Sequence, residues 1–171
     1  LSKGLVIGRC HGQMEFGLRA LGNRSILCDP RKFENISIIN EKIKKRDFWM
    51  PFTPTILHED RNKFILNPKN IDGRFMSMAF DTKKFAHQNL QAAIHPYDKT
   101  ARAQILKKEH NKKYYDIIKA FKDLTGVGAL LNTSLNLHGL PIAMNYNDTI
   151  HVFENSDLDV VILDGCYLKK I

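Results

Sequence analysis

The sequence feature that most constrains the fold is one amphipathic helix with strand-like segments on both sides of it. Between residues 112 and 125, apolar side chains recur at helical spacing: Tyr114, Ile117, Ile118, Phe121 and Leu124. Gly126 follows as a helix-ending residue. Residues 100–106 alternate between apolar and polar, and residues 127–131 form a short apolar run. This strand–helix–strand order predicts a sheet packed against helices.

The rest of the chain continues this interleaving. Further strands are predicted at residues 4–9, 25–28, 55–57, 74–80 and 90–94. One helix is predicted from Asn35, as its N-cap, to the basic cluster Lys42, Lys44, Lys45 and Arg46, and another at residues 147–155. A hairpin is predicted around Asp164-Gly165. Because no repeat or linker interrupts the pattern, residues 1–171 are predicted to form one α/β (α+β) domain around a mixed sheet.

Composition indicates a globular protein with an anionic partner. The 171 residues suffice for one domain, and an apolar content of 43% suffices for a core. The formal net charge of +8 favours phosphates, nucleotides, nucleic acid or acidic lipid as partners. Charge by itself leaves these partners open, together with a basic surface that binds nothing specific.

The cysteines indicate the cellular compartment of the protein, and the first residues indicate whether the chain is part of a longer one. Cys10, Cys28 and Cys166 stand far apart, and no Cys or His cluster has the spacing of metal ligands. We therefore predict neither a disulfide nor a metal site, and a reducing cytoplasm is the simplest location. No apolar run is long enough to span a membrane. Because the chain opens on Leu1 and enters a strand almost at once, we expect a piece of a longer protein.

Two segments carry basic residues in settings that suit phosphate. Residues 12–25 combine three glycines with Arg19 and Arg24, and guanidinium forks bind phosphate oxygens at two points. The alternative is a glycine-rich turn with solvated arginines. Residues 43–52 place Lys44 and Arg46 beside a rigid aromatic and proline segment, where a cation suits a phosphate or a developing negative charge. The alternative there is an ordinary basic helix end.

A third segment supplies neutral polar groups. Residues 131–139 contain Asn132, Ser134 and Asn136 directly after an apolar run. Ser134 lacks a nucleophile-elbow setting and an evident base, so these residues are predicted to hydrogen-bond a carbonyl or a phosphate. Arg102, on the polar face of its strand, is predicted to join them. His95 and His138 are the histidines nearest these segments, with a satisfied structural histidine as the alternative for each.

These segments resemble the C-terminal domain of the O-carbamoyltransferase family, which modifies nodulation factors, cephamycins and aminoglycosides. The family pattern G-R-M-E-F-G-P-R-A-L-G-N-R-S-I-L is similar to residues 12–27, with Gln13 for arginine and Leu18 for proline. Its I-N-x-x-I-K-x-R-E and F-R-P-F-A-P blocks resemble residues 39–47 and 49–54, with Met50 in place of the second block's arginine. The blocks H-x-D-G-T-A-R-x-Q and T-G-x-P-x-L-L-N-T-S-F-N-x-x-G-x-P-I resemble residues 95–104 and 125–142.

The resemblance implies a fold similar to threonylcarbamoyl-adenylate synthase, with a twisted mixed sheet. It implies a domain that binds carbamoyl phosphate and ATP, with magnesium expected on the ATP phosphates, and forms carbamoyl-adenylate. An N-terminal domain of the full-length protein would carry the hydroxyl acceptor. Carried over residue by residue, the phosphates are bound by Lys44, Arg102, Asn132 and Ser134, of which Lys44, Arg102 and Ser134 are assigned to catalysis. Arg19 binds the nucleotide, and Arg24, Arg46 and Asn136 complete the predicted binding set.

Two other functions belong to the same implied fold. One is a double-stranded RNA-binding module, which the clustering of basic residues in short Gly- and Asn-containing motifs argues against. The other is a free-standing threonylcarbamoyl-adenylate synthase, which the motif at residues 17–25 argues against.

Overall fold

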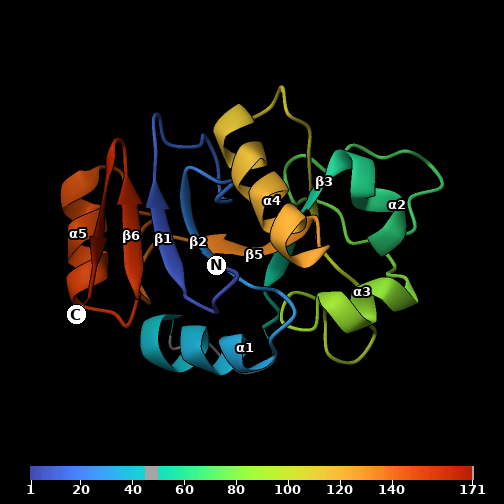
Figure 1. The fold of residues 1–171 in the computed structure, drawn as a ribbon, viewed down its shortest axis with the longest axis horizontal. Helices are drawn as coiled ribbons and strands as arrows, with labels where there is room; N and C mark the ends of the chain where they lie inside the picture. The colour runs from blue at the N-terminus through green and yellow to red at the C-terminus, as the bar shows by residue number, and fades with distance from the viewer. Residues whose placement is uncertain (45–49, 171) are drawn as a thin grey trace.

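A seven-stranded mixed sheet forms the centre of the molecule in the computed structural model, which describes residues 1–44 and 50–170 (Figure 1). The strands are β1 (Ile7–Cys10), β2 (Arg24–Cys28), β3 (Thr53–Leu57), β4 (Gln104–Leu106), β5 (Ala129–Ser134), β6 (Val160–Leu163) and β7 (Cys166–Lys169). Their spatial order is β4-β3-β5-β2-β1-β6-β7. The pairs β3–β4 and β1–β6 are parallel, and the other neighbours are antiparallel. The prediction of an α/β fold with a mixed sheet is confirmed.

Helices cover both faces of this sheet. They are α1 (Glu34–Ile39), α2 (Arg61–Phe64), α3 (Lys84–Asn89), α4 (Lys112–Thr125) and α5 (Tyr146–Glu154), with a π-helical turn η1 (Asn40–Lys44) and a 3-10 turn η2 (His58–Asp60). In Figure 1, α5 and α2 lie at opposite ends of the long axis, and α4 crosses the sheet between them. Among the described helices, none has the length and apolarity needed to cross a membrane.

Alternation along the strands divides the core into two clusters. In β2, Leu27 joins the cluster under α4, whereas its neighbours Ile26 and Cys28 join the cluster with α1 and α5. Successive side chains of a strand point to opposite faces, so the two clusters lie on the two faces of the sheet. Both faces are therefore covered, which explains why the central strands are apolar without a solvent-facing side.

The helix α4 has the boundaries that the sequence predicts. Asn111 caps it, because the Asn111 Oδ1 accepts a hydrogen bond of 3.1 Å from the Tyr114 N–H. It ends at Gly126, whose φ of 78° lies in the left-handed region. Tyr114, Ile118 and Phe121 are buried on its inner face, as predicted, but Leu124 is 74% exposed. The predicted apolar stripe is thus one turn shorter in the structure.

Two predicted strands are wrong, as is one predicted cap. Residues 74–80 do not form a strand; only Phe80 makes an isolated bridge, to Ala101. Residues 90–94 follow α3, and Leu90 ends that helix. Short apolar runs do not distinguish a strand from a buried turn, because burial alone explains both. Asn35 does not cap α1: it is buried, and its Nδ2 donates to the Asp29 carbonyl. The hairpin of β6 and β7 is confirmed.

We expect Gly22→Ala to destabilise the fold much more than Gly17→Ala. Both glycines have a φ of 120°, so alanine strains the backbone equally at the two positions. At Gly22 an added Cβ would lie 2.2 Å from Tyr114 Cδ1, whereas at Gly17 it would meet open space. The clash should lower the free energy of unfolding by roughly 1–3 kcal/mol more at Gly22. Urea unfolding of both variants measures this difference, and equal losses would contradict close packing of Gly22 on α4.

Candidate functional site

A hollow opens at the sheet edge where β3 begins and β5 ends. Thr53 of β3 and Asn132 of β5 are register partners at this edge. An inner lobe of about 40 Å³ is lined by Leu18, Arg19, Ala20, Pro51, Phe52, Thr53, Met76, Arg102, Asn132, Thr133 and Ser134. An outer lobe of about 430 Å³ shares Arg19, Pro51, Phe52, Thr53 and Arg102 with it and adds Met50, Ala79, His95 and Thr100. The two lobes form one hollow, which we call the β3–β5 hollow.

Two guanidinium groups from distant parts of the sequence meet in this hollow. Arg19 comes from the glycine-rich loop before β2 and is exposed, and Arg102 precedes β4 and is half-buried. Both arginines line both lobes. Guanidinium groups stay charged at any physiological pH and bind planar or tetrahedral oxyanions through paired N–H groups. The hollow is therefore suited to an anion.

Asn132 supplies a fixed amide on the wall of the inner lobe. The side chain is 1% exposed, and its Nδ2 donates to the Ala20 carbonyl and to Thr55 Oγ1, each at 3.1 Å. Its Oδ1 is buried and accepts no hydrogen bond from the described residues. A buried carbonyl oxygen without a donor is costly unless a ligand or water supplies one. Asn132 therefore offers an acceptor to an N–H or O–H group of a ligand.

Lys44 reaches the same sheet edge from η1 and holds the end of β5. Its Nζ donates to the Ser134 carbonyl at 2.5 Å and to Ser134 Oγ at 3.2 Å. It also donates to the carbonyl and the Oδ1 of Asn136, at 3.0 and 2.5 Å. The Lys44 side chain is 2% exposed. Lys44 therefore lies behind Ser134, which lines the inner lobe, and fixes the position of that serine.

Asn136 has an internal role in the loop after β5. Its Oδ1 accepts from Ser134 Oγ at 2.6 Å as well as from Lys44, and its Nδ2 donates to the carbonyls of Leu137 and Leu140. It lines neither lobe of the β3–β5 hollow. The structure thus places Asn136 as a support for Lys44 and Ser134.

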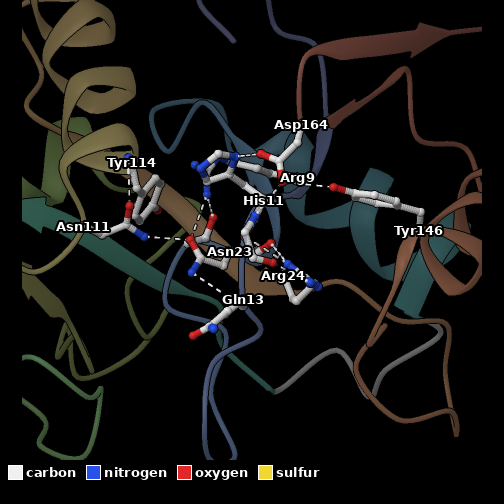
Figure 2. Close-up of polar contacts among 11 residues, drawn as sticks. Arg9, His11, Gln13, Asn23, Arg24, Asn111, Tyr114, Tyr146 and Asp164 are labelled. Carbon is white, nitrogen blue, oxygen red and sulfur yellow. Dashed lines mark hydrogen bonds and ion pairs between the residues drawn. The ribbon is translucent and has the colours of Figure 1, made fainter.

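Arg24 lies outside the hollow, although it stands in the same loop motif as Arg19. It is 5% exposed, and its guanidinium donates to the carbonyls of His11 and Asn23 (Figure 2). It also donates to the carbonyls of Gly12 and Met144. Glu15 orders the same loop, since its Oε1 accepts from the backbone N–H groups of Leu21, Asn23 and Arg24. Arg24 therefore ties the loop to the chain before α5 and has its donors occupied by backbone.

His95 brings a titratable group to the outer lobe. Its Nδ1 lies 3.1 Å from the Asp98 Oδ1. Asp98 also accepts hydrogen bonds from the backbone N–H and the hydroxyl of Thr100, and these bonds hold the pKa of Asp98 below its usual value. Met50, where the family pattern has arginine, lines the same lobe. The outer lobe is thus less cationic than the family pattern implies.

The structure brings together most of the predicted site. Four of the predicted residues line the inner lobe: Arg19, Arg102, Asn132 and Ser134. Lys44 contacts it through Ser134, and Arg46 lies outside the described residues. Thr133, within the polar segment 131–139, also lines it. Thr53 lines it too and was not predicted, because a threonine within a strand gives no signal by itself. Among the described residues, no group of three or more His, Cys, Asp or Glu could hold a metal ion.

An α/β domain with two arginines in a hollow at one sheet edge has the chemistry of an anion-binding protein. The family model for the carbamoyltransferase C-terminus matches residues 1–170, and the chain belongs to this family. Nodulation protein NolO of Bradyrhizobium diazoefficiens is 41% identical over 99% of this chain and 31% of its own length. Nodulation protein NolNO of Sinorhizobium fredii is 40% identical over 99% of this chain and 25% of its own.

A relative with a named reaction matches over the same span. The 3'-hydroxymethylcephem-O-carbamoyltransferase of Amycolatopsis lactamdurans is 31% identical over 99% of this chain and 32% of its own length. The chain therefore spans a quarter to a third of the length of these relatives.

We expect very unequal effects on stability from removing the two arginines of the glycine-rich loop. Arg24→Met leaves several buried carbonyls without donors and should lower the free energy of unfolding by roughly 3 kcal/mol. Arg19→Met removes an exposed side chain and should change it by less than about 0.5 kcal/mol. Urea unfolding measures both values. A stable Arg24→Met variant would show that the carbonyl contacts contribute little.

Proposed function

We propose that the β3–β5 hollow binds carbamoyl phosphate and ATP, and that this chain is the carbamoyl-activating domain of an O-carbamoyltransferase. The observation that carries the proposal is the meeting of Arg19, Arg102 and Asn132 in one hollow, although they come from three separate parts of the sequence. Family membership supports the carbamoyl chemistry, and the relative named as an O-carbamoyltransferase supports a hydroxyl acceptor.

The proposed roles follow from the chemistry of each group. Arg19 and Arg102 neutralise phosphate oxygens. The free Oδ1 of Asn132 accepts a hydrogen bond from the amide N–H₂ of the carbamoyl group, which a phosphate does not have. Lys44 keeps Ser134 in place, and its charge lowers the energy of negative charge that develops nearby. The wider outer lobe takes the nucleoside, with Phe52 and Met50 on its walls.

The proposed reaction activates the carbamoyl group as an adenylate. Water splits carbamoyl phosphate into carbamate and phosphate, and a carbamate oxygen then attacks the α-phosphorus of ATP. Pyrophosphate leaves as the bond between the α- and β-phosphates breaks, so one water is consumed for each carbamoyl-adenylate formed. Magnesium is expected on the ATP phosphates. The protein contributes positioning and charge neutralisation, which are the main sources of rate in phosphoryl transfer.

The acceptor step is assigned to another part of the full-length protein. The relatives are three to four times as long as the segment that matches them, judged from matched shares of 25–32%. We propose that an N-terminal domain binds the hydroxyl acceptor and receives the activated carbamoyl group. The chain alone is then expected to form the adenylate without completing the transfer.

Calorimetry with carbamoyl phosphate and with ATP tests the proposal. Lys44→Ala should weaken binding by roughly 2–4 kcal/mol, because it removes a buried charge and frees Ser134. Arg102→Met should weaken binding of both ligands by about tenfold or more. Lys119→Ala, which removes the same charge from an exposed position on α4, should leave both affinities unchanged.

Two outcomes would contradict the proposal. Unchanged affinity in Lys44→Ala and Arg102→Met, in variants that unfold at the same urea concentration as the wild type, would remove the hollow from ligand binding. Binding of double-stranded RNA whose affinity falls steeply with salt, and which Lys119→Ala weakens as much as Arg102→Met does, would instead indicate a diffuse nucleic-acid surface.

A further inference from the structure

A second hollow lies at the opposite edge of the sheet from the β3–β5 hollow. The strands β3 and β4 are parallel, so their carboxyl ends meet at one edge, and polar crevices at that edge are common ligand sites in α/β proteins. The hollow has a volume of about 240 Å³, and its lining includes His58, Arg61, Asn67, Asp72, Lys107 and His110. Its lining includes residues just after β3, such as His58, and Arg61 of α2. We call it the β3–β4 hollow.

Nitrogen-bearing side chains from two segments line this hollow. His58 and Arg61 follow β3, and Lys107 and His110 follow β4. Arg61 Nη1 donates to the His58 carbonyl at 2.7 Å, and Arg61 forms no ion pair with a carboxylate of the described residues. Lys107 has only a loose contact of 3.7 Å with Glu109, which is exposed. Two permanent cations therefore remain available to a ligand.

The wall opposite these cations is preformed. Asn67 clamps the loop that follows α2, since its side chain both donates to the Ile71 carbonyl and accepts from the Ile71 N–H, at 2.8 and 2.9 Å. The loop is tied to β4 by a hydrogen bond of 3.0 Å from the Ile105 N–H to the Gly73 carbonyl. Asp72, the acidic residue of the lining, accepts from the Arg74 N–H at 3.0 Å. A ligand would therefore enter without ordering a new loop, which favours binding.

We propose that the β3–β4 hollow is a second anion site, separate from the β3–β5 hollow, for a small phosphate-bearing molecule. A volume of about 240 Å³ suits a small molecule, and an arginine, a lysine and two imidazoles in one lining match a phosphate better than a single carboxylate. This site stands independently of the function proposed for the β3–β5 hollow.

The histidines couple this site to pH. Burial, followed by Arg61 and Lys107, lowers the pKa of His58, against the opposing charges of Glu59 and Glu109. Burial, followed by Arg74, lowers the pKa of His110, with Lys107 acting in the same direction and Glu109 and Asp72 opposing. Burial thus favours the neutral form of both imidazoles while no anion is bound. A bound anion favours their protonated forms, so anion binding takes up protons and strengthens as the pH falls through the histidine range.

Proton NMR of the histidine ring hydrogens, during a titration with inorganic phosphate, tests the proposal on the full chain. His58→Gln and His110→Gln assign the two resonances. Phosphate should raise the pKa that the chemical shifts of His58 and His110 report in a pH titration. The resonances of His87 and His151, which are exposed and line neither hollow, should not respond. With sulfate, which stays a dianion, affinity should rise several-fold between pH 7.5 and pH 5.5.

Matched variants separate the two hollows. Lys107→Gln, at an exposed position, and Arg61→Gln should each weaken the phosphate response of His58 and His110 by about tenfold, while Arg19→Met with Arg102→Met should leave it unchanged. Resonances of His58 and His110 that move no more than those of His87 and His151 would overturn the proposal. So would a response that Lys107→Gln and Arg61→Gln preserve and the Arg19 and Arg102 variants abolish.

Discussion

The site depends on how one central strand changes from apolar to polar without leaving the sheet. β5 begins with Ala129 and Leu130 in the core and ends with Asn132 and Ser134 at the sheet edge. Such buried polar groups are tolerated only if they are hydrogen-bonded. Lys44 satisfies the end of the strand, and Ala20 and Thr55 satisfy the Asn132 amide. These hydrogen bonds connect the end of β5 to the chain before β2, to the turn η1 and to β3.

One buried polar atom at the end of β5, the Asn132 Oδ1, has no hydrogen-bond partner among the described residues. Every donor of the Asn132 amide is directed to a protein acceptor, whereas the Asn132 Oδ1 has no donor among the described residues. Beside it, Arg19 and Arg102 supply positive charge. The hollow thus combines two cations with one hydrogen-bond acceptor in its wall.

Two arginines in one short motif have unrelated roles, which only their burial distinguishes. Arg19 is exposed at the hollow, whereas Arg24 is buried and binds backbone carbonyls of residues 11–12 and of Met144. A guanidinium group with its donors occupied by carbonyls supports the loop and leaves nothing to offer a ligand. At the other end of β3, Arg61 also donates to a backbone carbonyl, that of His58. Unlike Arg24, it keeps other N–H donors available.

The sequence by itself determined the elements whose signals are local. These include α4, with its periodic stripe and Gly126, the hairpin at Asp164-Gly165, and the family motifs that named Arg19, Lys44, Arg102, Asn132 and Ser134. Tertiary structure decided what depends on distant partners. Residues 90–94 are mostly apolar because the turn after α3 is buried, and Arg24 is held by the carbonyl of Met144, 120 positions further along the chain, as well as by nearby carbonyls. Burial and hydrogen-bond partners are set by the whole chain, so a local pattern contains no record of them.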